Sequence, residues 1–125
     1  MKTKNEIIFA SHTPWDNPYQ GHYTKVLFIC SAGILRSATA AHVFAAKGYN
    51  TRCAGSEEYA LIPVTGDLLL WADKIVFVNE ENYASVATKF SLDDFKDKIQ
   101  VCDIPDQYDY RNPVLVALLE EQVDL

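Results

Sequence analysis

The sequence lacks the features that mark several large classes of protein. None of its apolar runs is long enough to cross a membrane, and it contains no internal repeat and no low-complexity tract. The apolar stretch Ile7–Ala10 near the amino terminus is too short for the hydrophobic core of a signal peptide. We therefore expect a cytoplasmic protein that has no membrane partner.

Positive charge and cysteine are also scarce. Lysine and arginine total 11 against 17 aspartate and glutamate residues, and the net charge of −6 argues against a broad surface for nucleic acid or anionic membranes. One local positive pocket is still compatible with this balance. The three cysteines, Cys30, Cys53 and Cys102, are odd in number and lack metal-type spacing. Reduced thiols, without a metal or other cofactor, are the best interpretation.

The remaining composition is that of one ordinary globular domain. The chain has 125 residues, of which 49% are hydrophobic and 22% are charged. Residues 25–125 are expected to form this domain, and residues 1–24 an N-terminal extension of uncertain structure. Within the extension, Ile7–Phe9 is compatible with a short strand. His12, Asp16 and His22 have no paired or helical spacing, so we interpret them as loop residues rather than metal ligands.

Strand patterns alternate with helix patterns along residues 25–125. Apolar or β-favouring runs predict strands at Val26–Ile29, Tyr49–Ala54, Lys74–Val78 and Lys98–Cys102. Helical patterns follow each run, with Ser37, Thr65, Asn79 and Asn112 as candidate N-caps, and residues 91–95 predict a further helical turn. This order predicts an α/β fold: a three-layer sandwich around a parallel sheet of four or slightly more strands, with right-handed crossovers.

The run Cys30–Ser37 has the chemistry of an anion-binding loop that carries a nucleophile. It joins a buried strand to a helix, whose free N–H groups attract anions. Arg36 offers a planar bidentate fork, and Gly33 tolerates the positive φ that a curled loop requires. Such a setting favours the thiolate of Cys30. Ser37 has two compatible interpretations, as a helix cap and as a hydrogen-bond partner of the Cys30 sulfur.

Other polar segments follow the ends of the remaining strands. Ala54-Gly55, Asn79 and Asp103–Asp106 each come directly after a predicted strand. Because ligand sites of parallel sheets lie at the carboxyl ends of the strands, we expect these segments to gather around Cys30.

Three quoted segments together resemble a known family. Val26–Ser37, Cys53-Ala54-Gly55 and Ile104–Tyr108 resemble the low-molecular-weight protein tyrosine phosphatases, with the loop C-x5-R-S followed by an acid segment. The resemblance covers residues 25 to 123 and is greatest to a small branch from bacteria and phages. It implies the fold of that family and a phosphoric monoester hydrolase that acts on phosphotyrosine proteins or on phosphorylated small molecules, without metal or cofactor.

The resemblance also implies roles for individual residues. Cys30 would attack phosphorus to form a cysteinyl-phosphate, Arg36 would hold the equatorial oxygens, and Asp106 would act as general acid and then general base. Asp103 is the reserve acid. Tyr108 would stack on an aromatic substrate. The substrate-binding residues would be Ser31, Ala32, Gly33, Ile34, Leu35, Ser37 and Tyr108.

The sequence departs from the family pattern at three positions. Gly33 replaces an asparagine and Cys53 a serine, and these two family side chains hydrogen-bond to brace the loop. Leu35 replaces a second loop cysteine, which precludes a local disulfide with Cys30 and leaves Cys30 open to terminal oxidation. We therefore expect a less braced loop and slow turnover.

Two other functions share this loop. One is a catalytically weak module that binds phosphate or phosphopeptides. The other is an arsenate reductase, which needs a second thiol able to reach Cys30, and Cys102 is the candidate.

Overall fold

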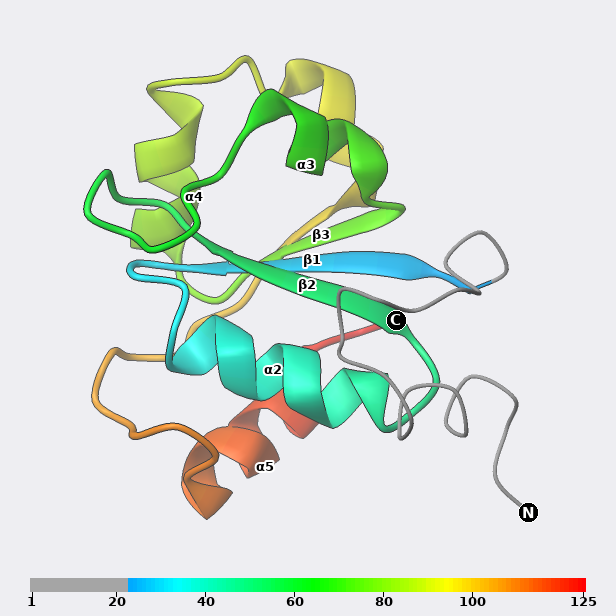
Figure 1. Ribbon diagram of the computed structural model, residues 1–125, viewed down its shortest axis with the longest axis vertical. Helices are drawn as coiled ribbons and strands as arrows, with labels where there is room; N and C mark the ends of the chain where they lie inside the picture. The colour runs from blue at the N-terminus through cyan, green and yellow to red at the C-terminus, as the bar shows by residue number, and fades with distance from the viewer. Residues whose placement is uncertain (1–22) are drawn as a thin grey trace.

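The computed structural model describes residues 23–125 of the chain (Figure 1). The predictions made for Ile7–Phe9 and for His12, Asp16 and His22 lie outside the described residues. The same holds for nearly all of the predicted extension at residues 1–24.

A parallel sheet of four strands forms the middle layer, in the order β2-β1-β3-β4. The strands are β1 (Lys25–Cys30), β2 (Asn50–Gly55), β3 (Lys74–Phe77) and β4 (Ile99–Val101). The central strand β1 is the apolar run noted in the sequence, and its residues 26–30 are all buried. Its last residue, Cys30, pairs in register with Gly55, so the carboxyl ends of β1 and β2 lie side by side.

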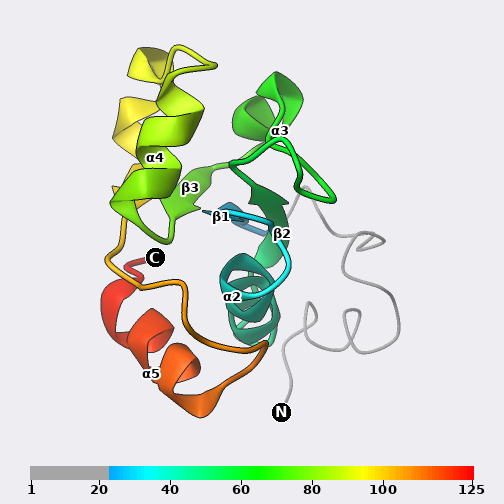
Figure 2. The ribbon, with the colours of Figure 1, turned by 90° about the vertical axis from the view of Figure 1, so that its left-hand side faces the viewer.

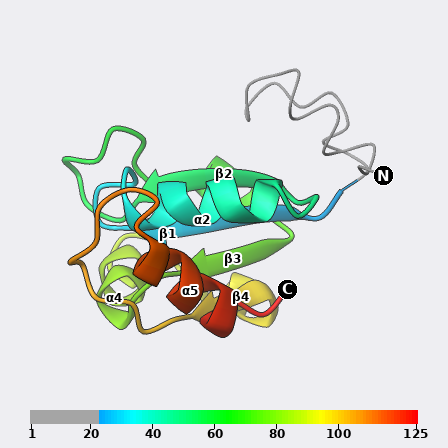
Figure 3. The same ribbon diagram turned by 90° about the horizontal axis from the view of Figure 1, so that it is seen from below.

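Helices cover both faces of the sheet (Figures 1 and 2). On one face lie α2 (Arg36–Ala45) and α5 (Pro113–Gln122), which run next to each other in the view from below (Figure 3). On the other face lie α3 (Gly66–Trp71), α4 (Glu80–Ala87) and the 3₁₀ helix η3 (Asp93–Lys98). The predicted three-layer α/β sandwich is confirmed.

The alternation of side chains along β1 divides the core into two clusters. Val26 and Phe28 pack toward α2 and α5, whereas Leu27 and Ile29 pack toward α3 and α4. Each helix therefore needs only one apolar face, as the sequence pattern indicated. Among residues 23–125, no helix is both long and apolar enough to span a membrane.

Three of the four predicted N-caps are confirmed. The side chains of Thr65, Asn79 and Asn112 accept hydrogen bonds from backbone N–H groups at 3.2, 3.0 and 2.8 Å. The fourth prediction is wrong, because α2 begins at Arg36 with Leu35 as its N-cap and without a side-chain cap. Ser37 therefore lies within the helix. The sequence pattern predicts a helix that reaches about Lys47, whereas α2 ends at Ala45.

Candidate active site

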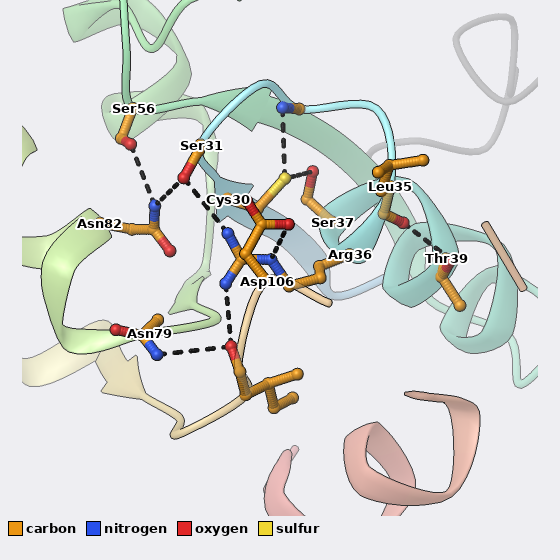
Figure 4. A network of polar contacts seen from close by, with 12 residues as sticks. Cys30, Ser31, Leu35, Arg36, Ser37, Thr39, Ser56, Asn79, Asn82 and Asp106 are labelled. Atoms are coloured by element: carbon orange, nitrogen blue, oxygen red, sulfur yellow. Dashed lines mark hydrogen bonds and ion pairs between the residues drawn. The ribbon is translucent and has the colours of Figure 1, made fainter. Parts of the chain in front are cut away.

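The loop between β1 and α2 curls around the sulfur of Cys30 (Figure 4). The Gly33 N–H donates a hydrogen bond to Cys30 Sγ at 3.2 Å. A second hydrogen bond joins Cys30 Sγ to Ser37 Oγ at 3.0 Å. Both partners can stabilise negative charge on the sulfur. Of the two interpretations of Ser37, the contact with Cys30 is therefore the one that the geometry favours.

The backbone of the loop is tied to the segment that follows β2. The carbonyls of Cys30 and Ser31 accept hydrogen bonds from the N–H groups of Ser56 and Glu57, at 2.7 and 3.2 Å. Gly33 has a φ of 77°, which confirms the predicted left-handed turn. A Cβ at Gly33 would lie 2.8 Å from the backbone of Ala54 and Gly55, so the loop packs directly against the end of β2.

Arg36 lies between the loop and the acid segment. Its side chain is only 3% exposed. Nη1 donates to the Ile104 carbonyl at 2.8 Å, and Nη2 donates to Ser31 Oγ at 3.2 Å. Nε lies 3.6 Å from Asp106 Oδ1 and has no hydrogen-bond partner among the described residues. The guanidinium is thus fixed in position between the loop and Asp106.

The acid segment, residues 104–111, is brought to the loop by its buried first residue. Ile104 is fully buried, its N–H donates to the Val78 carbonyl, and its carbonyl also accepts from Asn79 Nδ2 at 3.4 Å. Asp106 follows with its side chain 60% exposed, next to Arg36. The backbone of Asp103 instead bonds to Gln122 of α5, with its N–H 2.7 Å from Gln122 Oε1. The expected gathering of the strand ends is confirmed.

The remaining predicted site residues lie in the loop, except Tyr108. Ala32 and Leu35 are half-buried in the loop, and Ile34 is 51% exposed beside them. Tyr108 is half-buried and packs against the core cluster under α2 and α5, and its hydroxyl accepts a hydrogen bond from Gln107 Nε2 at 3.3 Å.

Sequence reasoning missed Asn82, which links the loop to the end of β2. This side chain of α4 is 2% exposed, and its Nδ2 donates to Ser31 Oγ and to Ser56 Oγ, each at 3.1 Å (Figure 4). A signal was present in the sequence. Asn82 stands one helical turn before the buried Val86, so it is a polar residue on the apolar face, in the first turn after a strand end.

Burial changes the acidity of the other two cysteines. All three cysteines are free thiols. Burial, followed by the nearby Cys30, raises the pKa of Cys53 above its ordinary value. Burial also raises the pKa of Cys102 to about 11. Cys53 and Cys102 therefore remain protonated near neutral pH, and a protonated thiol is a poor nucleophile.

Solved structures of phosphatases share this arrangement of elements. The tyrosine phosphatase Wzb from Escherichia coli K30, solved with phosphate, matches with a TM-score of 0.62 and 16% identity, over 80% of this chain and 93% of its own. YwlE, an arginine phosphatase from Geobacillus stearothermophilus, matches with a TM-score of 0.59 and 18% identity, over 79% of this chain and 85% of its own. A protein tyrosine phosphatase from Entamoeba histolytica matches with a TM-score of 0.58 and 19% identity, over 79% of this chain and 90% of its own.

The chain has the fold of these phosphatases. The fold expected from the resemblance is thereby confirmed. Neither the family models nor the curated proteins include a match to the sequence. At identities of 16 to 19%, the likeness concerns the fold, and the chemistry has to be argued from the side chains of this chain.

Proposed function

We propose that the protein is a phosphatase that hydrolyses phosphotyrosine or other aryl phosphate monoesters through a cysteinyl-phosphate. The observation that carries the proposal is the cluster of Cys30, Arg36 and Asp106 at the carboxyl end of β1. A buried sulfur with two hydrogen-bond partners, a buried guanidinium and an exposed carboxylate meet there. The phosphatases of the same fold support the assignment.

In the first step, the Cys30 thiolate attacks phosphorus and the bond to the phenolic oxygen breaks. Arg36 and the loop N–H groups hold the equatorial oxygens while charge moves onto the leaving group. Asp106, next to Arg36, gives its proton to the departing phenolate. Help of this kind is worth about 10² to 10⁴-fold in rate. Nucleophile and acid thus come from segments about 75 residues apart in sequence.

In the second step, water attacks the phosphorus of the cysteinyl-phosphate. The Asp106 carboxylate takes a proton from that water, and the phosphorus–sulfur bond breaks to return the Cys30 thiolate. Ser37 Oγ, at 3.0 Å from the sulfur, can donate a hydrogen bond that stabilises this leaving thiolate. Ser37 thus acts on the step in which sulfur departs, and the loop residues hold the phosphoryl oxygens throughout.

A phosphate-binding module with slow turnover is the second candidate. It is favoured by the position of Asp106, whose side chain is 60% exposed and lies 3.6 Å from Arg36 Nε, so the acid is held less firmly than the buried Arg36 and the loop that would bind phosphate. Arsenate reduction has less support, since the raised pKa values of Cys53 and Cys102 disfavour either thiol as the attacker of a Cys30 adduct.

Hydrolysis of p-nitrophenyl phosphate, phosphotyrosine and phosphoarginine across pH tests the proposal. Phosphoarginine is included because an arginine phosphatase shares the fold. We expect Cys30→Ser to abolish turnover, and Asp106→Asn to lower kcat for phosphotyrosine by about 10² to 10⁴-fold. Wild-type activity with Cys30→Ser would refute the proposed mechanism.

Matched variants control for the two substitutions. Cys53→Ser exchanges another thiol for a hydroxyl, and Asp103→Asn neutralises the reserve acid, whose backbone is tied to α5. We expect both to keep most of the turnover. If Asp103→Asn abolishes turnover instead and Asp106→Asn does not, the acid is Asp103. Vanadate binding that depends on Arg36, without turnover of any ester, would favour the binding module.

A further inference from the structure

Thr39 is a buried threonine that contacts both the phosphate loop and the acid segment. It lies in α2 and is fully buried. Its hydroxyl donates a hydrogen bond to the carbonyl of Leu35 at 2.7 Å (Figure 4). The same oxygen accepts a hydrogen bond from the backbone N–H of Arg111 at 2.8 Å. One hydroxyl thus joins the last loop residue before Arg36 to a residue that lies five positions after Asp106.

The acid segment is held at its two ends. At the first end, the Ile104 carbonyl accepts hydrogen bonds from Arg36 and Asn79. At the second end, the Arg111 N–H bonds to Thr39. Between these anchors Tyr108 is half-buried against the core, and the other residues, Asp106 included, are exposed. The position of Asp106 therefore depends on how firmly both ends are fixed.

Arg111 needs its anchor because its backbone is strained. It has a φ of 63° and is the sole non-glycine residue with a positive φ within residues 23–125. Side chains other than glycine disfavour this conformation, so it persists where surrounding contacts impose it. The hydrogen bond to Thr39 is such a contact. Without the hydroxyl, the turn would lose this bond and relax.

We propose that Thr39 is a positioning residue, which through Arg111 holds the acid segment so that Asp106 stays next to Arg36. The inference rests on the proposed phosphatase function and adds a residue to it. Thr39 touches neither the sulfur nor the guanidinium. Its effect on turnover is exerted through the placement of Asp106.

Two esters that differ in leaving group separate this role from a general effect on the fold. p-Nitrophenolate departs with little help from an acid, whereas phenolate needs its proton. We expect Thr39→Val to lower kcat/KM for phenyl phosphate by about 10-fold or more, because a misplaced acid loses part of its 10² to 10⁴-fold contribution to departure of the leaving group. For p-nitrophenyl phosphate, kcat/KM should fall far less. Thr39→Ser keeps the hydroxyl and should restore the rate with both esters.

Thr51→Val is the matched control. Thr51 is also buried, and its hydroxyl donates to the Ala41 carbonyl of α2 at 2.8 Å. It is therefore a comparable threonine bond that does not involve the acid segment. We expect Thr51→Val to affect thermal stability without any selectivity between the two esters. If Thr39→Val lowers kcat/KM equally for both esters, or if Thr39→Ser resembles Thr39→Val, the positioning role is wrong.

A double variant tests the route through Asp106. In the Asp106→Asn background, the acid is already lost, so adding Thr39→Val should change kcat/KM for phenyl phosphate little. Multiplication of the two effects would overturn the proposal.

Amide hydrogen exchange gives a measure that does not require turnover. Thr39→Val should accelerate exchange in residues 105–112 and leave β1 and β3 unchanged, whereas Thr39→Ser should match the wild type. Equal rates in all three proteins would overturn the positioning role. If the wild type hydrolyses no ester, the phosphatase function fails, and the exchange rates still decide whether Thr39 fixes the segment.

Discussion

Replacing Gly33 by alanine should break the contact between the loop and β2. A left-handed φ costs an alanine about 1 to 2 kcal/mol relative to glycine. The new Cβ would also lie 2.8 Å from the backbone of Ala54 and Gly55, which cannot rotate away as a side chain would. Overpacking of this kind costs about 1 to 3 kcal/mol. We therefore expect Gly33→Ala to lower the free energy of unfolding by about 2 to 5 kcal/mol.

Denaturant unfolding and vanadate titration together measure this effect. Vanadate should bind Gly33→Ala more weakly, because the N–H of residue 33 is the group that reaches the Cys30 sulfur. The matched control is Gly66→Ala, since a Cβ there meets nothing within 4 Å. It should leave stability and vanadate affinity close to wild type. Equal stability of the two variants would refute the close packing of the loop on β2.

The same reasoning opposes an apparently restorative substitution. The family that the sequence resembles carries asparagine where this chain has Gly33, so Gly33→Asn would introduce that family's residue. Asparagine tolerates the left-handed region better than alanine does, but it brings the same Cβ toward Ala54 and Gly55. We expect Gly33→Asn to bind vanadate more weakly than the wild type. A gain in affinity or turnover would contradict this expectation.

Two further predictions concern Asn82 and Cys102. Asn82→Ala should lower the free energy of unfolding by about 1 to 3 kcal/mol, because Ser31 and Ser56 lose a buried partner, and it should also weaken vanadate binding. The control is Thr65→Ala, which removes the N-cap of α3. It should lower the free energy of unfolding by about 1 kcal/mol without changing vanadate affinity. Burial raises the pKa of Cys102 from 9.0 to about 11. The folded state therefore retains a proton that the unfolded state loses, so Cys102 contributes stability below pH 9 that disappears as the pH rises to 11. The free energy of unfolding should decline between pH 8 and pH 11, and the decline should be smaller in Cys102→Ala than in the wild type by at most roughly 2 to 3 kcal/mol. Equal declines in the two proteins would contradict this contribution of Cys102.

Features encoded by neighbouring residues were predictable from the sequence. The caps at Thr65, Asn79 and Asn112 each bond to an N–H two or three residues ahead, so a short window contains both partners. The buried strand before Cys30 and the left-handed turn at Gly33 are equally local. The choice of Asp106 as the acid came from the resemblance, and its contact with Arg36 supports that choice.

Features that depend on distant partners were missed. Asn82 bonds to residues 51 and 26 positions away, and no local pattern reports such a pairing. Thr39 meets Arg111 across 72 positions. Ser37 was misassigned as a cap because α2 begins one residue earlier, at Arg36, which places Ser37 within the helix. Its hydroxyl bonds to the sulfur of Cys30 instead.

The position of the acid, more than the bracing of the loop, is what turnover should depend on. The sequence indicated a slack loop, because Gly33 and Cys53 replace a bracing pair of side chains. In the folded chain, backbone bonds from Ser56 and Glu57 hold the start of the loop, and the side chain of Asn82 holds Ser31. A slack loop is therefore no longer the expected cause of slow turnover. Asp106 is different, because it is 60% exposed and its ion pair with Arg36 is long, at 3.6 Å. Contacts that fix the acid segment should therefore change the rate more than contacts that fix the loop.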